Sequence, residues 1–307
     1  MPTLKEIKGR IGSVKSTLKI TSAMKLVSSA KLRKAQNAIA AMRPYEEALQ
    51  KMLAMAQGAG NVPGNVPLPS KMADFAGNVL EKVPSPAVIV AIASNSSLCG
   101  GFNANVIAKV RSVRRSGDVV YSIGRKMADA MARDGFRSPK DYSSLSEHPA
   151  YAEAAALVEK LSEDFYDGRI SGVTLVYTHF VSTSRQVPVA ERLLPVETPD
   201  RVGGDEEAVI PGPSSVIPAP DRVSEAILEP SARELLEALL PRTLKLKLYA
   251  ALLDSAAAEH AARTVAMQTA TDNAEDLLSE LTLQYNKGRQ QKITSEILDL
   301  AGGQAAE

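Results

Sequence analysis

Residues 230–265 read PSARELLEALLPRTLKLKLYAALLDSAAAEHAARTV, and the run continues to Gly303 with no glycine before Gly288. Pro230 and Ser231 are residue types that favour the first turn of a helix and its N-cap. The sequence therefore predicts one very long helix, roughly 105 Å for some seventy residues at ~1.5 Å per residue. Pro241 lacks an N–H group, and we expect it to kink the first turns.

Small and apolar side chains recur along this helix at alternating intervals of four and three residues. They are Leu244, Leu248, Ala251, Ser255, Ala258, Ala262 and Val265. This spacing is typical of a coiled-coil seam, the line of side chains that faces a partner helix, and alanine and serine let that partner approach closely. We therefore expect Ala262 to lie in the seam and Ala257 on the outer face of the helix.

A second pattern of the same kind opens the chain. Residues 3–56 carry a heptad seam at Leu4, Ile7, Ile11, Val14, Leu18 and Thr21. It predicts a helix of about 80 Å at ~1.5 Å per residue, in which Pro44 is a candidate kink. Because this helix is shorter than the C-terminal one, pairing of the two would leave one end of the longer helix alone.

Strands alternate with helices between the two long helices. We expect strands over residues 86–94, 118–124 and 172–180, helices over 103–115, 125–133 and 151–168, and an antiparallel edge strand over 186–196. Such an alternation favours a parallel α/β sheet. The predicted fold class is thus a long two-helix coiled coil with an inserted α/β domain.

Segments rich in proline and glycine divide the chain further. Residues 57–72 hold three Gly and three Pro, and residues 195–221 hold six Pro and three Gly. We interpret the first as a linker and the second as a long exposed loop, followed by a short strand at 226–229. The predicted domains are a helix over residues 1–57, a linker over 58–72, the α/β domain over 73–229 and a helix over 230–307.

The charge is unevenly distributed although the net charge is only +1. Residues 1–45 hold ten Lys and Arg against one Glu, and residues 196–230 hold two Arg against eight Asp and Glu. The basic helix could bind nucleic acid, but residues 1–44 offer no aromatic side chains to stack on bases, so an acidic protein partner is the better interpretation. No apolar run is long enough to span a membrane, and no secretion signal precedes the first helix.

The chain contains no recognisable catalytic or cofactor motif. Neither GxGxxG nor GxxxxGK[ST] occurs, so we interpret the turn at Cys99-Gly100-Gly101 as a tight strand-to-helix connection. Cys99 is the only cysteine, and the three histidines stand at no metal-ligand spacing. We therefore predict no cofactor, no metal site and no catalytic residue, which argues against the alternative of a nucleotide-dependent enzyme.

Three motifs resemble the gamma subunit of the F-type ATP synthase, in the order found in that family. They are RIGSVKSTLKITSAMKLVSSAKLR at residues 10–33, SNSSLCGGFN at 94–103 and AMQTATDNAEDLLSELTLQYNKGRQQKITSEILD at 266–299. The resemblance covers essentially the whole chain. It departs at residues 95–97, where many members have an acidic residue, Arg and Gly, and at Gln304, where many have Ala.

The resemblance implies a fold and a function. The two helices would form a left-handed antiparallel coiled coil, with a Rossmann-like domain inserted between them. The chain would be the central rotor shaft, turned by the c-ring and driving the catalytic beta subunits through their nucleotide states, without catalysing a reaction itself. Its partners would be the alpha, beta and epsilon subunits and the c-ring, with no nucleic acid and no small-molecule substrate.

The resemblance also implies a location and a set of contact residues. The protein would be a peripheral membrane protein on the cytoplasmic face of the inner (plasma) membrane. The positions where the family's shaft meets the ring of alpha and beta subunits correspond to Met24, Lys25, Arg263, Arg289, Gln290, Thr294 and Asp299.

Overall fold

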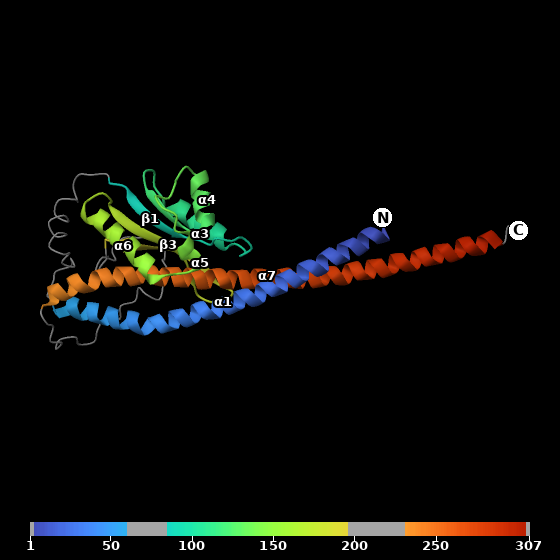
Figure 1. Ribbon diagram of the computed structural model, residues 1–307, viewed down its shortest axis with the longest axis horizontal. Helices are drawn as coiled ribbons and strands as arrows, with labels where there is room; N and C mark the ends of the chain where they lie inside the picture. The colour runs from blue at the N-terminus through green and yellow to red at the C-terminus, as the bar shows by residue number, and fades with distance from the viewer. Residues whose placement is uncertain (1–2, 60–84, 196–230, 305–307) are drawn as a thin grey trace, which may run out of the picture. The chain divides into compact units, whose positions relative to one another are not determined.

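The computed structural model describes residues 3–59, 85–195 and 231–304 (Figure 1). Within these ranges its elements are α1 (Leu4–Ala59), β1 (Ala87–Ile92), α3 (Phe102–Val113), β2 (Val119–Ile123), α4 (Arg125–Arg133), α5 (Ser143–Glu147), α6 (Tyr151–Tyr166), β3 (Gly172–Phe180), β4 (Gln186–Leu194) and α7 (Ala232–Gln304). The long helices, the three parallel strands and the edge strand are confirmed, whereas the short helix α5 was not predicted.

Most of the predicted linker, nearly all of the long exposed loop and the strand at 226–229 lie outside the described residues.

The chain divides into two compact units, and both long helices contribute to each. The sheet unit comprises Lys31–Ala262, and the coiled unit comprises Met1–Ala30 together with Arg263–Glu307. The sheet unit therefore holds the strands, the shorter helices, the C-terminal half of α1 and the N-terminal part of α7. The coiled unit consists of the remaining parts of α1 and α7.

The sheet has the strand order β2-β1-β3-β4. β1 pairs in parallel with β2 and with β3, and β4 pairs antiparallel to β3 at the edge. The continuous apolar run of β1 fits this arrangement, because a parallel sheet is covered on both faces and its central strands are buried on both sides.

The turn after β2 depends on a glycine. Gly124 adopts φ +97°, and a Cβ built on it would lie 2.2 Å from the carbonyl oxygen of Ala93. The backbone of β1 and the start of α4 can approach this closely only where no side chain intervenes. The same approach lets the Lys126 N–H donate to the carbonyl oxygen of Ser94 at 3.1 Å.

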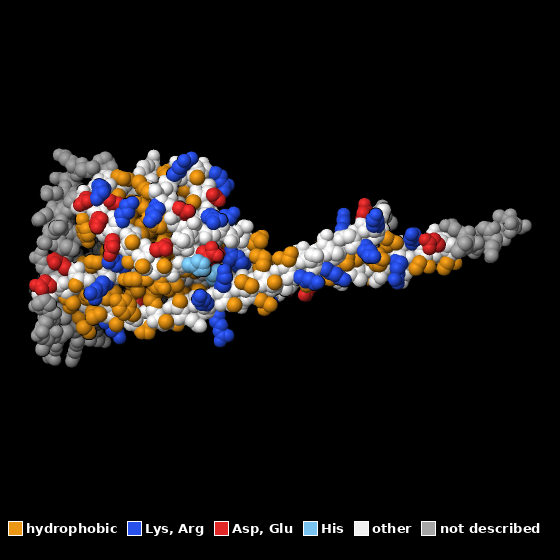
Figure 2. All heavy atoms as spheres, in the orientation of Figure 1, with side chains coloured by type: hydrophobic (Ala, Val, Ile, Leu, Met, Phe, Trp, Pro, Cys, Tyr) orange, Lys and Arg blue, Asp and Glu red, His pale blue; other side chains and the backbone are white. Residues whose placement is uncertain are grey.

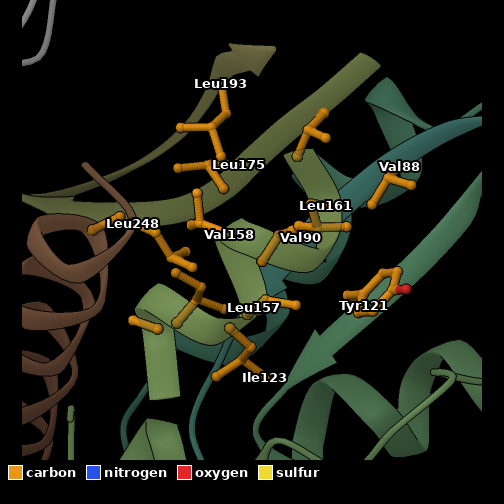
Figure 3. Packing of buried hydrophobic residues seen from close by; sticks show 14 of the residues in the cluster. Val88, Val90, Tyr121, Ile123, Leu157, Val158, Leu161, Leu175, Leu193 and Leu248 are labelled. Carbon is orange, nitrogen blue, oxygen red and sulfur yellow. The ribbon is translucent and has the colours of Figure 1, made fainter. Parts of the chain in front are cut away.

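One face of the sheet packs against α6 and α7. The buried cluster there contains Val90, Leu157 and Leu175 from the sheet and α6, and it also contains Leu248 of α7. Figure 3 shows Leu248 directed from α7 into this cluster, near Leu175. The N-terminal part of α7 is thus a structural layer of the sheet unit as well as a coiled-coil strand.

The predicted seam of α7 was wrong. Leu244, Leu248 and Ala251 belong to the core of the sheet. Ala258 packs with Cys99 and Phe102, Ala262 packs against the same cluster and not against α1, and Val265 is 43% exposed. The side chains of α7 that pack with α1 are others. They are Leu236, Leu239, Leu240 and Leu246 against Leu49, Leu53 and Ala56, and Ala257 and Ala261 against Leu32.

Two distinct faces of α7 are therefore buried in the sheet unit. Leu244 and Leu246 lie two residues apart, so they point about 200° apart around a helix of 3.6 residues per turn. Ala257, which we expected on the outer face, is 0% exposed because it lies against Leu32 of α1.

Candidate partner-binding surfaces

The coiled unit is an antiparallel pair of helices whose register is fixed at two points. Thr271 Oγ1 lies 3.0 Å from Thr21 Oγ1 in a buried contact. A Cβ built on Gly288 would lie 3.1 Å from Leu4 Cδ2. At both points the two residue numbers add to 292, so one register holds throughout the unit.

The N-terminal heptad predicted from the sequence is confirmed in this unit. Ile7 and Thr21 are buried, and Ile11, Val14 and Leu18 are partly buried. Gly288 marks the point at which the end of α1 approaches α7 closely, beside Leu4. A larger residue at 288 would have to displace the Leu4 side chain.

α7 extends beyond its partner helix. Gly288 faces Leu4, the first residue of α1, so the remainder of α7 to Gln304 lies past the N-terminal end of α1. All side chains over residues 289–298 are exposed. This confirms that, among the residues the structure describes, the longer helix ends without a partner helix.

The coiled unit exposes large apolar side chains to solvent. Leu283 is 72% exposed, Leu26 70% and Ile20 60%. Others in the same unit are Val27, Val265, Leu277, Ile293, Ile297 and Leu298. Figure 2 shows apolar side chains next to Lys and Arg on this part of the molecule. A concentration of exposed apolar side chains on a two-helix unit is typical of a surface that binds another protein.

The predicted contact residues fall into two groups within the coiled unit. In this register, Lys25 of α1 lies opposite Met267 of α7, and Arg263 of α7 lies opposite Ser29 of α1. Met24, Lys25 and Arg263 therefore lie within about one or two helical turns of each other. All three side chains are partly buried.

The second group lies on the unpaired end of α7. The side chains of Arg289, Gln290 and Thr294 are exposed, and Thr294 Oγ1 donates to the carbonyl oxygen of Gln290 at 2.9 Å. Asp299 belongs to the same helix, and its side chain lies outside the described residues. The two groups are separated by roughly 39 Å of helix, at ~1.5 Å per residue between Arg263 and Arg289.

A third set of polar residues, which joins α7 to the sheet and to α6, could not be predicted from the sequence. Lys247 Nζ lies 2.9 Å from Glu191 Oε1 of β4, and Lys245 Nζ lies 2.5 Å from Glu159 Oε1 of α6. The ring of His179, near the end of β3, is hydrogen-bonded to Asp254 of α7. These partners lie far apart in the sequence, so no local pattern could have revealed them.

Neither a candidate metal-binding cluster nor a membrane-spanning helix occurs among the described residues. Among residues 3–59, 85–195 and 231–304, no group of three or more His, Cys, Asp or Glu side chains could hold a metal ion. Within the same ranges, no helix is both long enough and apolar enough to cross a membrane. Cys99 is buried and lies 3.2 Å from Asn103 Nδ2 in the turn before α3.

Comparison with known proteins gives matches over the full length of the chain. A family model described as ATP synthase matches residues 3–306. The ATP synthase gamma chain of Bacteroides fragilis is 44% identical over 313 residues, covering 100% of both chains. That of Phocaeicola vulgatus is 42% identical with the same coverage.

Solved structures share the fold at lower identity. A chain of the Euglena gracilis mitochondrial ATP synthase, from a structure of OSCP, F1 and the c-ring, has a TM-score of 0.65 at 17% identity and covers 99% of this chain and 94% of its own. A chain from the central stalk and c-ring of the Tetrahymena thermophila mitochondrial ATP synthase has a TM-score of 0.53 at 22% identity, with coverage of 82% and 99%.

Proposed function

The chain belongs to the ATP synthase gamma-chain family, and from this premise we propose that it is the central rotor subunit of a proton-translocating ATP synthase. Rotation of the c-ring would turn the chain, and the turning coiled unit would drive the catalytic beta subunits in succession through their nucleotide states. The proposed partners are the alpha and beta subunits, the c-ring and the epsilon subunit.

The exposed apolar surface of the coiled unit is the main observation that supports this proposal. Leu26 and Leu283 contribute nothing to the core of the free chain, since each is at least 70% exposed. Fully burying such a side chain is worth about 1.5–3 kcal/mol. A surrounding ring of subunits would bury them and would also enclose the end of α7 that extends past α1.

We propose that the two groups of predicted residues are contacts with this ring. Met24, Lys25 and Arg263 would meet it where both helices are present. Arg289, Gln290, Thr294 and Asp299 would meet it where α7 is alone. The exposed polar side chains at 289, 290 and 294 can hydrogen-bond a partner without first breaking side-chain contacts within the coil.

We propose that the chain itself is not catalytic and lies on the cytoplasmic face of the inner (plasma) membrane as a peripheral subunit. Its sequence lacks both phosphate-binding loop motifs, which supports a mechanical role. The segment division also remains a proposal, with helices over residues 1–57 and 230–307, a linker over 58–72 and the α/β domain over 73–229.

Co-assembly tests the proposal. The chain is co-expressed with the alpha and beta subunits of its own organism, and we expect a stable complex that hydrolyses ATP and contains one copy of the chain. Leu26→Gln should lower the yield of complex while leaving the melting temperature of the free chain unchanged. Met52→Gln is the matched control, because Met52 is an exposed apolar residue of α1 in the sheet unit. Failure of the wild-type chain to assemble would refute the proposed function.

A further inference from the structure

The carboxyl end of β3 is joined to α7 by a pair of titratable side chains. His179 is the second-last residue of β3, and its Nδ1 is hydrogen-bonded to Asp254 Oδ2. The other carboxylate oxygen of Asp254 accepts the backbone N–H of Phe180 at 3.1 Å. One carboxylate of α7 therefore holds both the side chain and the backbone at the end of β3.

This contact lies at the margin of the apolar interface between α7 and the sheet. The side chains of His179 and Asp254 are 16% and 18% exposed, so water reaches them only partly. β3 ends at Phe180, and the turn 181–185 then leads into β4. Without the pair, His179 and Phe180 would be held to the sheet only through β4, because the pairing of β3 with β1 ends at Val176.

We propose that His179 and Asp254 form a pH-sensitive clasp that fastens the end of β3 to α7, firmly when His179 is protonated and more weakly when it is neutral. A protonated ring forms an ion pair with the carboxylate, whereas a neutral ring retains only a hydrogen bond. Hydrogen bonds between charged partners are shorter and roughly twice as strong as neutral ones. The clasp should therefore change in strength without being lost.

The charges around the clasp favour the protonated ring. The hydrogen bond to Asp254 raises the pKa of His179 above its ordinary value, burial lowers it, and the charges of Asp254 and of Glu191 on β4 raise it further. Glu191 also binds Lys247 of α7 and the Tyr177 hydroxyl. Burial, followed by the charges of Glu191, Asp254 and Glu46 of α1, raises the pKa of Tyr177, so the phenol stays neutral across the range in which His179 titrates.

The sign of the pH effect follows from the raised pKa. The additional stabilisation that protonation of His179 gives the clasp is fully present below the ordinary histidine pKa of about 6.5, and this part is lost as the pH rises through the higher pKa of His179 in the folded chain. If the chain acts as the proposed rotor, acidification of the surrounding compartment would stiffen the joint between the α/β domain and α7. This consequence rests on the proposed function, whereas the clasp itself does not.

NMR of the full chain tests the clasp directly. The imidazole Cε1–H signal of His179, assigned by its loss in His179→Gln, should titrate with a midpoint above 6.5. The Phe180 amide shift should follow the same midpoint, because this N–H donates to the same carboxylate. In Asp254→Asn, which keeps an acceptor for Phe180, the midpoint of His179 should fall below that of the wild type, and the Phe180 titration should disappear.

His148 provides the internal control, since it is exposed and lies outside the clasp. At a fixed pH, the chemical shift of its Cε1–H signal should be the same in the wild type and in Asp254→Asn. A His179 midpoint that does not move in Asp254→Asn, or a Phe180 amide that does not titrate with His179, would overturn the inference. Either result would leave the proposed rotor function standing, because that function is tested by assembly.

Discussion

Replacing Ala257 by leucine should destabilise the sheet unit, although the sequence pattern places this residue on an outer face. Ala257 and Ala261 are both 0% exposed and pack with Leu32 of α1, which is itself 8% exposed. Three added carbon atoms have no free volume here, so the helices must separate or Leu32 must leave its rotamer. Overpacking of this kind costs about 1–3 kcal/mol.

A compensating substitution sharpens this prediction. Leu32→Ala alone should cost about 2–5 kcal/mol, because it leaves a cavity between the helices. In the double variant the leucine at 257 can fill that cavity, so the combined loss should be smaller than the sum by about 0.5–3 kcal/mol, as expected for side chains in contact. The sign of this coupling reports directly on which face of α7 meets α1.

The assay is thermal and urea unfolding of the full chain, followed by circular dichroism. Ala238→Leu is the control, because Ala238 is an exposed residue of α7 in the same unit and alanine and leucine are both strong helix formers. It should be nearly neutral, and combined with Leu32→Ala it should be additive to within about 0.3–0.5 kcal/mol. The packing of Ala257 against Leu32 would be refuted if Ala257→Leu and Ala238→Leu lowered the stability equally. It would also be refuted if the effects of Leu32→Ala and Ala257→Leu were additive.

Two further predictions concern the turn after β2 and the unpaired end of α7. Gly124→Ala should cost more than ~2 kcal/mol, because it combines a positive φ with a Cβ too close to a backbone carbonyl, and a lower urea midpoint would show this. Arg289→Ala with Gln290→Ala should lower the yield of assembled complex and its steady-state ATPase rate, while the complexes that do form still rotate. Hydrogen bonds to charged groups contribute only about 1.5–3 kcal/mol each, so full assembly with unchanged turnover, or assembled but wholly uncoupled complexes, would contradict this reasoning.

The elements of the fold could be predicted because their signals are local. A glycine-free run, a heptad pattern and buried runs such as that of β1 each reflect the geometry of a single helix or strand. The seam of α1 was predicted correctly over Leu4–Thr21 for the same reason, since α1 carries a single heptad pattern there. The alternation of strands with helices then indicated the parallel sheet.

The orientation of α7 could not be predicted because two of its faces carry equivalent patterns. Leu244, Leu248 and Ala251 repeat at intervals of four and three residues, and so do Leu246, Ala250 and Leu253. Periodicity gives the spacing of a buried face, but it does not identify the element that covers it. Only the tertiary structure shows that the first set meets the sheet. The bond between His179 and Asp254 was missed for a related reason, because it joins residues 75 positions apart.

The coiled unit also has apolar side chains whose covering element must be identified, and here that element is a partner protein. In the sheet unit, α7 is covered by α1 on one face and by the α/β elements on another. In the described part of the coiled unit only α1 covers it, yet large apolar side chains such as Ile20, Leu277 and Leu283 remain exposed. Their burial would contribute about 1.5–3 kcal/mol each, against an association cost of about 4–15 kcal/mol. No single contact can therefore hold the proposed rotor in its ring, and binding must be shared along the whole unit, including the unpaired end of α7.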